Sequence, residues 1–339
     1  MPTINCSCSA IGSLARILIE PSTATQGTLA TFSAASERTE FMFERIGSKR
    51  NIAYTNAITG SISRLRTGVR NKSYLVQGVL ALQPSPYNLD IWLPRITGGT
   101  LGAVGSGALT DTDADGNDKA ITLSSILPEF DMLIYRESHI ASYEKCQVAN
   151  AILRGRTTNG GDGLEFLELI VVIIGQEELI YQTGAANPWP AAEPPLVTTA
   201  NALPYTFWES TIALNGVDVP YDEFSLGINN NLSVSFRNKQ FPTCIRSTGR
   251  NVDLDIKAPG ICDPIREALS LNTTEGTAQL SLATPSPVSM HTDFQIPFAR
   301  STFETPNANG RGEIFTDISL EAFSDQGDDE LVIQNDSTI

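Results

Sequence analysis

The segment DTDADG, from Asp111 to Gly116, spaces its carboxylates as the start of a calcium-binding loop does. An EF-hand loop also requires a Glu at position 12 and a helix on either side. Position 12 of this segment is Thr122, position 9 is Lys119, and the flanking residues are glycine-rich and β-like. The sequence therefore favours an acidic loop that binds cations weakly over a specific metal site.

The other residue types that support catalysis form no known catalytic pattern. The segment GAVGSG, Gly102 to Gly107, resembles a dinucleotide-binding turn, but no βαβ pattern surrounds it. There is no Gly-x-Ser-x-Gly motif and no phosphate-binding loop, and His139 and His291 lie far from any pair of cysteines. The cysteines, whose spacing matches no zinc motif, are Cys6, Cys8, Cys146, Cys244 and Cys262. We therefore expect no enzyme activity and no cofactor.

The charge balance of the chain is acidic, with 38 acidic and 23 basic residues and a formal net charge of −15. Duplex binding depends on Lys and Arg neutralising phosphates, so this balance argues against a nucleic-acid-binding protein. Two local basic clusters are interpreted as solvated or subunit-contact charges: Arg45, Lys49 and Arg50, then Arg64, Arg66 and Arg70. The longest aliphatic run, Leu169 to Ile174, is far shorter than the ~20 residues of a membrane helix. Without a recognisable targeting signal, we expect a soluble protein that is completed in a cytoplasm and has no membrane partner.

The elements that would position any site are mainly strands. Residues 252–258 alternate between apolar and charged side chains, which is the period of a strand with one buried face. The segment TIALNGVDV, Thr211 to Val219, predicts a hairpin whose Asn-Gly pair accepts the positive φ of a type I′ turn. Each half of the chain also predicts one short helix. Ser85 and Pro86 begin the first, which Pro94 limits or kinks, and Asp263 and Pro264 begin the second.

The two halves of the chain contain the same elements in the same order. GGDGLEFLELIVVII (Gly160 to Ile174) matches NGRGEIFTDISLEAF (Asn309 to Phe323) at an offset of 312 − 163 = 149. LRTGVRNKSYLV (Leu65 to Val76) matches IRSTGRNVDLDI (Ile245 to Ile256) at an offset of 180, so the first half is 180 − 149 = 31 residues longer. We interpret this as a duplication, with chance similarity between β chains as the alternative.

The predicted organisation is an extended N-terminal arm (1–36), a first domain (37–190) and a second domain (191–339). The extra residues of the first domain form a glycine-rich and acidic insert, 97–125. A proline-rich bridge, Asn187 to Pro195, separates the two domains as a semi-rigid linker. The fold class is mainly β, with one short helix flanking each domain.

The copies differ on one strand face. In the second copy this face carries Asp317, Ser319 and Glu321, whereas the equivalent positions of the first copy are Glu168, Ile170 and Val172, with Ile174 beyond them. A strand that is apolar on both faces must be covered on both. We expect Ile170, Val172 and Ile174 to contact a neighbouring domain or subunit; cover by the chain's own helix or arm is the alternative.

One stretch of the first half, Asn56 to Gly99, resembles the tail tube proteins (major tail proteins) of long-tailed bacteriophages. The family pattern is a basic strand, a strand that ends in Leu-x-Pro-Ser-Pro, and a Leu-rich helix closed by Gly-Gly, as in LALQPSPYNLDIWLPRITGG. The following hairpin, Phe130 to Gly155, is also similar, including Cys146. The C-terminal portion, from YDEFSLGINNNL to GDDELVIQNDST, resembles that of the family. The likeness covers about residues 40–339, and the arm and the insert depart from the pattern.

The resemblance implies two tandem β-barrel or sandwich domains whose inner strands join into a ring. Rings of six such domains stack into a hollow tube that conducts DNA, so a duplicated chain would complete a ring as a trimer. An acidic lumen would repel phosphates, and Asp253 and Asp255 are candidate lumen residues, with ordinary solvent-facing carboxylates as the alternative.

The expected partners are further copies of the chain and other tail proteins (tape measure, terminator and baseplate). DNA would pass without specific binding, in a virion assembled in the host cytoplasm. The rival hypotheses are a cellular secretion-type tube or surface-layer protein, and a carbohydrate-active β-sandwich enzyme. The enzyme would need an aromatic platform, which Trp92, Trp189 and Trp208 do not obviously form.

Overall fold

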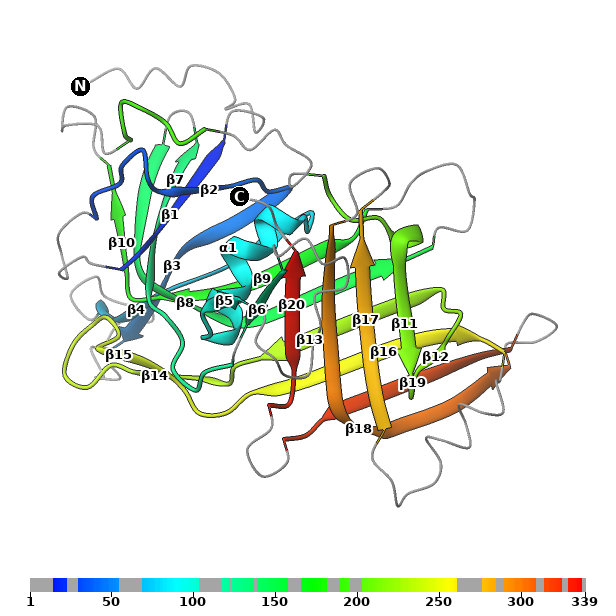
Figure 1. The fold of residues 1–339 in the computed structure, drawn as a ribbon. Helices are drawn as coiled ribbons and strands as arrows, with labels where there is room; N and C mark the ends of the chain where they lie inside the picture. Colours follow the sequence, from blue (N-terminus) through cyan, green and yellow to red (C-terminus); the bar gives the residue numbers. More distant parts are fainter. Residues whose placement is uncertain are drawn as a thin grey trace.

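A computed structural model gives the fold of the chain (Figure 1). The structure describes residues 15–22, 30–54, 69–103, 118–121, 123–136, 139–157, 166–181, 189–195, 203–260, 276–284, 290–308, 314–324 and 329–336. The described part is mainly β, and every strand pairing in it is antiparallel. It contains one α-helix, α1 (Pro86–Thr97), and one short 3-10 turn, Phe207–Glu209. The mainly β fold class is therefore confirmed.

We call the strands β1 to β10 the first half and β11 to β20 the second half. The first half contains β1 (Arg16–Pro21), β2 (Glu37–Thr39), β3 (Phe43–Tyr54), β4 (Val69–Leu82), β5 (Leu101–Ala103), β6 (Asp118–Ile121), β7 (Phe130–Arg136), β8 (His139–Arg156), β9 (Glu168–Gly175) and β10 (Glu177–Ile180). The second half contains β11 (Ser210–Leu214), β12 (Val217–Asp218), β13 (Glu223–Asn229), β14 (Leu232–Ser235), β15 (Cys244–Ser247), β16 (Asn251–Pro259), β17 (Gly276–Ala283), β18 (His291–Ala308), β19 (Ile314–Ala322) and β20 (Val332–Asp336).

One sheet runs through both halves in the order β3–β4–β9–β8–β13–β16–β19–β18; we call it the main sheet. The long strands β8 and β18 each leave this sheet and enter a second one. The first part of β8, residues 139–146, pairs with β7 and β10. The first part of β18, residues 291–299, pairs in the same way with β17 and β20. Each half is therefore folded around one long strand that belongs to two sheets.

The strand pairings of the first half recur in the second. The counterparts are β1 and β11, β2 and β12, β3 and β13, β4 and β16, β7 and β17, β8 and β18, β9 and β19, and β10 and β20. For example, β4 pairs with β3 and β9, and β16 pairs with β13 and β19. The repeated order of elements seen in the sequence therefore extends to the topology. The helix predicted at Asp263 lies outside the described residues.

Helix α1 forms where the sequence predicts it. The Ser85 side chain accepts a hydrogen bond from the backbone N–H of Asn88, and Gly98 ends the helix in the left-handed conformation at φ 75°. Pro94 lies inside the helix without ending it, so the helix reaches Thr97. Most of its residues are buried, including Trp92, whose indole N–H donates to the Thr39 hydroxyl at 3.1 Å.

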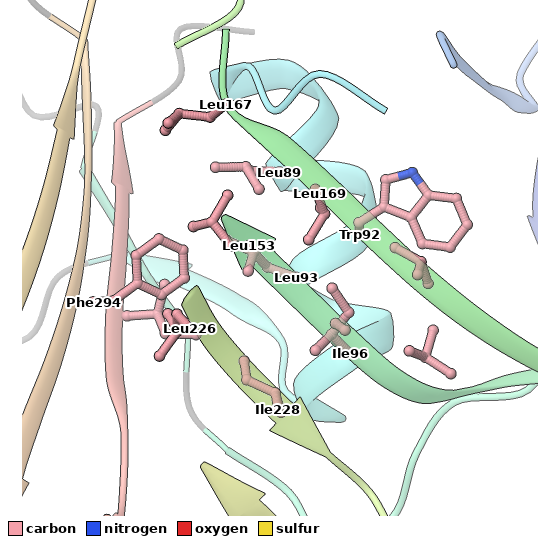
Figure 2. Close-up of a cluster of buried hydrophobic side chains, with 14 of the residues drawn as sticks. Leu89, Trp92, Leu93, Ile96, Leu153, Leu167, Leu169, Leu226, Ile228 and Phe294 are labelled. Carbon is pink, nitrogen blue, oxygen red and sulfur yellow. The ribbon is translucent and has the colours of Figure 1, made fainter. Parts of the chain in front are cut away.

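The core under α1 is built from both halves (Figure 2). The helix contributes Leu89, Trp92, Leu93 and Ile96, the first-half strands Leu153 and Leu169, and the second-half strands Leu226, Ile228 and Phe294. These buried side chains belong to one continuous cluster. Among the described residues no closed barrel is found, and the halves share a sheet and a core. The expectation of two separate tandem barrels is therefore not confirmed.

Part of the predicted arm, 1–36, is an integral strand. Residues Arg16–Pro21 form β1, which pairs with β2 on one side and β7 on the other. Ile17 and Ile19 are buried in the main core, and Leu18 is buried on the opposite face against Phe32. The small, polar composition of residues 1–36 predicts an extended arm, yet the segment ILI is covered on both of its faces.

The predicted insert, 97–125, also contributes to the sheets. Its strand β6 pairs with β20, the last strand of the second half, and Ile121 is buried in the core. The Lys119 ammonium lies 2.9 Å from the buried Asp90 carboxylate of α1. The insert therefore ties the first half to the second half. The acidic segment Asp111 to Gly116 lies outside the described residues.

The proline-rich bridge is fastened to the first half where the structure describes it, over residues 189–195. The Trp189 ring packs on Tyr135 of β7, with ring centroids 5.5 Å apart, and its indole N–H donates to Glu193 at 2.9 Å. The Glu193 carboxylate also forms ion pairs with Arg16 and Arg38. This part of the bridge is therefore held by side-chain contacts in addition to its prolines.

A buried carboxyl on β8 makes the stability of the fold depend on pH. The pKa of Glu144 is raised to about 7, mainly by burial and then by the nearby Asp131 and Glu177, while the Ala30 backbone N–H and Lys145 oppose the shift. The folded state therefore binds this proton more tightly than the unfolded chain, whose pKa is 4.5. The resulting stability is fully present below pH 4.5 and is lost as the pH rises through 7.

We expect Glu144→Gln to raise the free energy of unfolding at pH 8 by about 2 kcal/mol, because Gln is neutral at every pH and can still accept from the Ala30 backbone N–H. Urea titrations at several pH values would measure it. The same change at the exposed Glu40 serves as control. Equal pH profiles for Glu144→Gln and the unmutated chain would show that this carboxyl is not the cause.

Candidate assembly surface

The main sheet has one face against the core and one open face. On β9 the core face carries Leu169, Val171 and Ile173, all buried, and the residues between them are partly exposed. The same alternation holds along β16. We use the name open face for the partly exposed side of β4, β9, β8, β13, β16 and β19.

The first-half part of the open face is mostly apolar. Ile170, Val172 and Ile174 project from β9 and are each partly exposed. Ile170 lies opposite Ile152 of β8, and Val172 lies opposite Val79 of β4. Helix α1 packs on the other side of the sheet, so it does not cover them.

The second-half part of the open face is acidic. Asp253 lies opposite Glu321 of β19, and Asp255 lies opposite Ser319, whose hydroxyl donates to it. Burial, then Glu321 and Asp255, raises the pKa of Asp253 above its usual value. Burial is the main cause of this raised pKa, and repulsion from the neighbouring carboxylates adds to it. This surface is therefore suited to a positively charged neighbour.

Both sets of residues predicted from the sequence lie on this one face. The strand registers connect them in a row, with Ile170 opposite Ile152, Ile152 opposite Gly227, and Gly227 opposite Asp253. The sequence assigned Ile170, Val172 and Ile174 to a subunit contact and Asp253 and Asp255 to a lumen. The structure places all of them on the same side of a continuous sheet, so a molecule lying against one set is close to the other.

The sheets of the two halves meet at a seam between β8 and β13. Residues Asn150 to Arg156 pair with Glu223 to Asn229 in one uninterrupted antiparallel register. The pair Glu223 and Arg156 and the pair Ser225 and Arg154 face each other across it. Two copies of one strand arrangement are thus joined edge to edge; we call this contact the internal seam.

Side chains from the second half fasten the internal seam to the first half. The Asn230 amide donates to the carbonyl oxygens of Ile96 and Val148, at 2.8 and 3.0 Å. The Arg250 guanidinium donates to the carbonyl oxygens of Thr97 and Ser124, at 2.5 and 2.7 Å. These bonds satisfy carbonyl groups at the C-terminal end of α1, which the helix itself leaves open.

The β14–β15 hairpin also crosses from the second half onto the first. The backbone N–H of Tyr74 on β4 donates to the carbonyl of Gln240 at 2.8 Å. The Tyr74 ring packs on Phe241, with centroids 6.0 Å apart. A two-stranded hairpin is marginally stable alone, so this contact supports the hairpin and extends the seam.

The main sheet ends in two strand edges that have no strand beside them among the described residues. At one end, β3 pairs only with β4. At the other end, residues 303–308 of β18 pair only with β19. Met42, Phe43 and Ile52, at or next to the β3 edge, are about half exposed, at 50, 53 and 47%. An exposed apolar edge of this kind is a template for pairing with another chain.

No family model matches the chain, and a search of the curated proteins finds none that is similar to it. Among the described residues, no group of three His, Cys, Asp or Glu side chains could hold a metal ion. No helix in the described part is long and apolar enough to cross a membrane.

Sequence reasoning missed the residues that fasten the internal seam. Asn230 and Arg250 lie between strands, in a segment where polar residues are expected on any loop. The sequence repeat pairs Arg250 with Arg70, whereas the strand registers give an offset of 253 − 79 = 174, which puts Arg250 in line with Val76. The sequence match therefore gives no signal for the role of Arg250.

The role of the apolar part of the open face is testable. We expect Ile170→Asp with Val172→Asp to leave the chain folded and its assembly unchanged, because both residues are partly exposed and lie away from the two free edges. Circular dichroism and negative-stain electron microscopy would measure this. Loss of assembly by a folded double variant would support the expectation from the sequence, that these residues contact a neighbouring domain or subunit.

Proposed function

We propose that the chain is the structural subunit of a phage tail tube, built from two tail-tube-type domains and self-assembling into stacked hollow rings. The proposal extends the sequence resemblance. The observation that carries it is the internal seam. Two copies of one strand arrangement are joined edge to edge in a single sheet, and the corresponding outer edges are left at its ends.

A repeat of this kind favours a closed ring. A contact between two different edges of identical units is heterologous. Each added chain therefore leaves one free edge, and chains continue to add until the rotation between neighbours closes the ring. Each chain supplies two units, so three chains would provide six units around a ring with pseudo-six-fold symmetry. Closure would also cover the parts of both strand edges that an isolated chain leaves open. On β3 the backbone groups of Ile46 and Ser48 are already bonded to Arg136, Tyr143 and Glu178 of the same chain.

The open face has the chemistry of a wall along which DNA slides. Asp253, Asp255 and Glu321 repel phosphates. The basic residues of this face do not contradict this, because Arg154 is paired with the Glu168 carboxylate, Arg156 lies opposite Glu223, and Lys257 lies opposite Glu223 and Asp317. We propose that this face lines the hollow and that DNA passes without specific binding. On this view Ile170 and its neighbours also face the hollow.

Electron microscopy of purified particles tests the proposal. Averaged end-on views of hollow rings or tubes with three-fold symmetry would support it, and six-fold rings would contradict the trimer. Mass spectrometry of intact virions provides the second test. Presence of the chain as a major virion protein supports the tail tube function. Its absence from virions, with tubes present in cells, would favour the secretion-type or surface-layer alternative.

A further inference from the structure

We propose that β3 of one chain pairs antiparallel with residues 303–308 of β18 in a second copy, in the same register as the internal seam. This inference rests on the proposed function and adds to it the two edges that meet and the residues that face each other. The partner is a second copy of this chain because the internal seam already joins the counterparts of these edges, β13 and β8.

The counterpart of each β3 residue follows from the strand registers. Aligning β9 with β19 at the offset of 149 pairs Val172 with Glu321. Val172 lies opposite Val79, and Glu321 lies opposite Asp253, so Val79 corresponds to Asp253. The registers of the next strands, β3 and β13, extend this correspondence.

In β3, Arg45 lies opposite Val79, and in β13, Gly227 lies opposite Asp253. Arg45 is therefore the counterpart of Gly227. By the same step, Phe43 is the counterpart of Ser225.

The counterpart of each β8 residue is found in the same way. Ile152 of β8 lies opposite Ile170 of β9. The counterpart of Ile170 in β19 is Ser319, since 319 − 170 = 149, and Ser319 lies opposite Phe303 of β18. Ile152 therefore corresponds to Phe303, and Arg154 corresponds two residues later to Thr305.

The internal seam then gives the register between chains. It pairs Gly227 with Ile152 and Ser225 with Arg154. Their counterparts are Arg45 opposite Phe303 and Phe43 opposite Thr305. The proposed contact between chains is therefore defined at the level of single residues.

The charges at the two edges are complementary. Arg45 and Lys49 are exposed on the open-face side of β3. The end of the sheet that would meet them carries Asp317 and Glu321 of β19 on the same face, with Arg300 of β18 opposite Glu321. At strand spacings of about 4.8 Å, these two carboxylates lie within roughly one Debye length of the edge. A basic edge beside an acidic surface specifies the head-to-tail order and opposes pairing of two like edges.

Cysteine crosslinking tests the register in assembled particles. We expect Arg45→Cys with Phe303→Cys, and Phe43→Cys with Thr305→Cys, to yield covalent dimers and trimers with a short bis-maleimide. Arg45→Cys with Asn307→Cys is the matched control, because four residues displace the second thiol by about 13 Å along the strand. Each variant with only one of the two substitutions measures the crosslinking that the native cysteines contribute. Crosslinks in the shifted pair alone, or in no pair, would overturn the register.

A charge reversal tests the edge separately. We expect Arg45→Glu with Lys49→Glu to lower the assembled fraction at least about tenfold, because it places acidic groups on both sides of the contact. Lys239→Glu with Arg246→Glu makes the same change in net charge at exposed residues away from the edge and should assemble normally. Normal assembly of the β3 variant would overturn the proposal.

The outcomes separate this inference from the proposed function. Three-fold tubes that form without crosslinks at the matched pairs would sink the β3–β18 register and leave the tube function standing. If the purified chain does not assemble alone, the same cysteine variants are crosslinked in intact virions instead. Absence of the chain from virions would sink the function and this contact with it.

Discussion

Gly78→Ala should detach β3 from the main sheet. A Cβ on Gly78 would lie 2.3 Å from the Arg45 carbonyl oxygen and 2.5 Å from the Ile46 Cα. Both atoms belong to the backbone of β3, so no side-chain rotation relieves the contact and the strand itself must move. We expect a loss of about 3 kcal/mol in the free energy of unfolding, at the upper end of overpacking effects.

The variant should also fail to assemble, because the displaced strand carries one of the two free edges. Urea denaturation and electron microscopy would measure the two effects. Gly227→Ala is the matched control, since its Cβ would meet only the Asp253 carbonyl oxygen, at 3.9 Å. A Gly78→Ala chain with unchanged stability would show that β3 and β4 can separate locally without cost.

Arg250→Met should destabilise the chain by about 3 kcal/mol, the order expected when one partner of a buried ion pair is removed. The Arg250 side chain is only 10% exposed and lies 3.3 Å from the Glu330 carboxylate. It also donates to the carbonyl oxygens of Thr97 and Ser124. Its removal leaves the Ser124 carbonyl oxygen without this donor and the Thr97 carbonyl oxygen with the Ser124 backbone N–H alone. Met replaces the volume of the side chain without replacing its hydrogen bonds.

Thermal and urea unfolding would measure the change. Arg246→Met, at an exposed position on the same segment, should cost under about 0.5 kcal/mol. Glu330→Gln in the Arg250→Met background should recover part of the loss, because it removes the uncompensated charge. Equal effects at Arg246 and Arg250 would mean that the contacts with α1 contribute little.

Features set by neighbouring residues were predictable. Ser85 and Gly98 bound α1 because a side-chain acceptor and a left-handed residue act within a turn. The Asn215–Gly216 pair forms the predicted hairpin turn, at φ 51° and 74°. The alternation along Asn251–Pro259 matches the burial of β16, because one face of a strand has a period of two.

Features set by distant partners were not predictable from the sequence. Nothing in Arg16–Pro21 indicates that it lies between β2 and β7, and nothing in β6 indicates that it pairs with β20. The sequence repeat aligned the basic strand at an offset of 180, whereas the strand registers pair Val79 with Asp253, an offset of 253 − 79 = 174. A match of arginines near a turn located the repeat but left its register open.

For the candidate surface, the sequence indicates which side chains leave the core but not how they are arranged. Alternation alone shows that Val172 and Asp255 point away from a core, and both do. It does not show that two strands from different halves share a face. That relation depends on the pairing of β8 with β13, which no local pattern encodes.

The internal seam has a consequence for dilution. Because β8 and β13 belong to one chain, their association pays no translational entropy and is independent of protein concentration. Only contacts between chains obey mass action. Under the proposed assembly, a ring of three chains forms through two bimolecular associations and one closure, where six single-unit chains would need five associations and one closure. Such rings would form at lower concentration and, on dilution, would release intact two-unit chains.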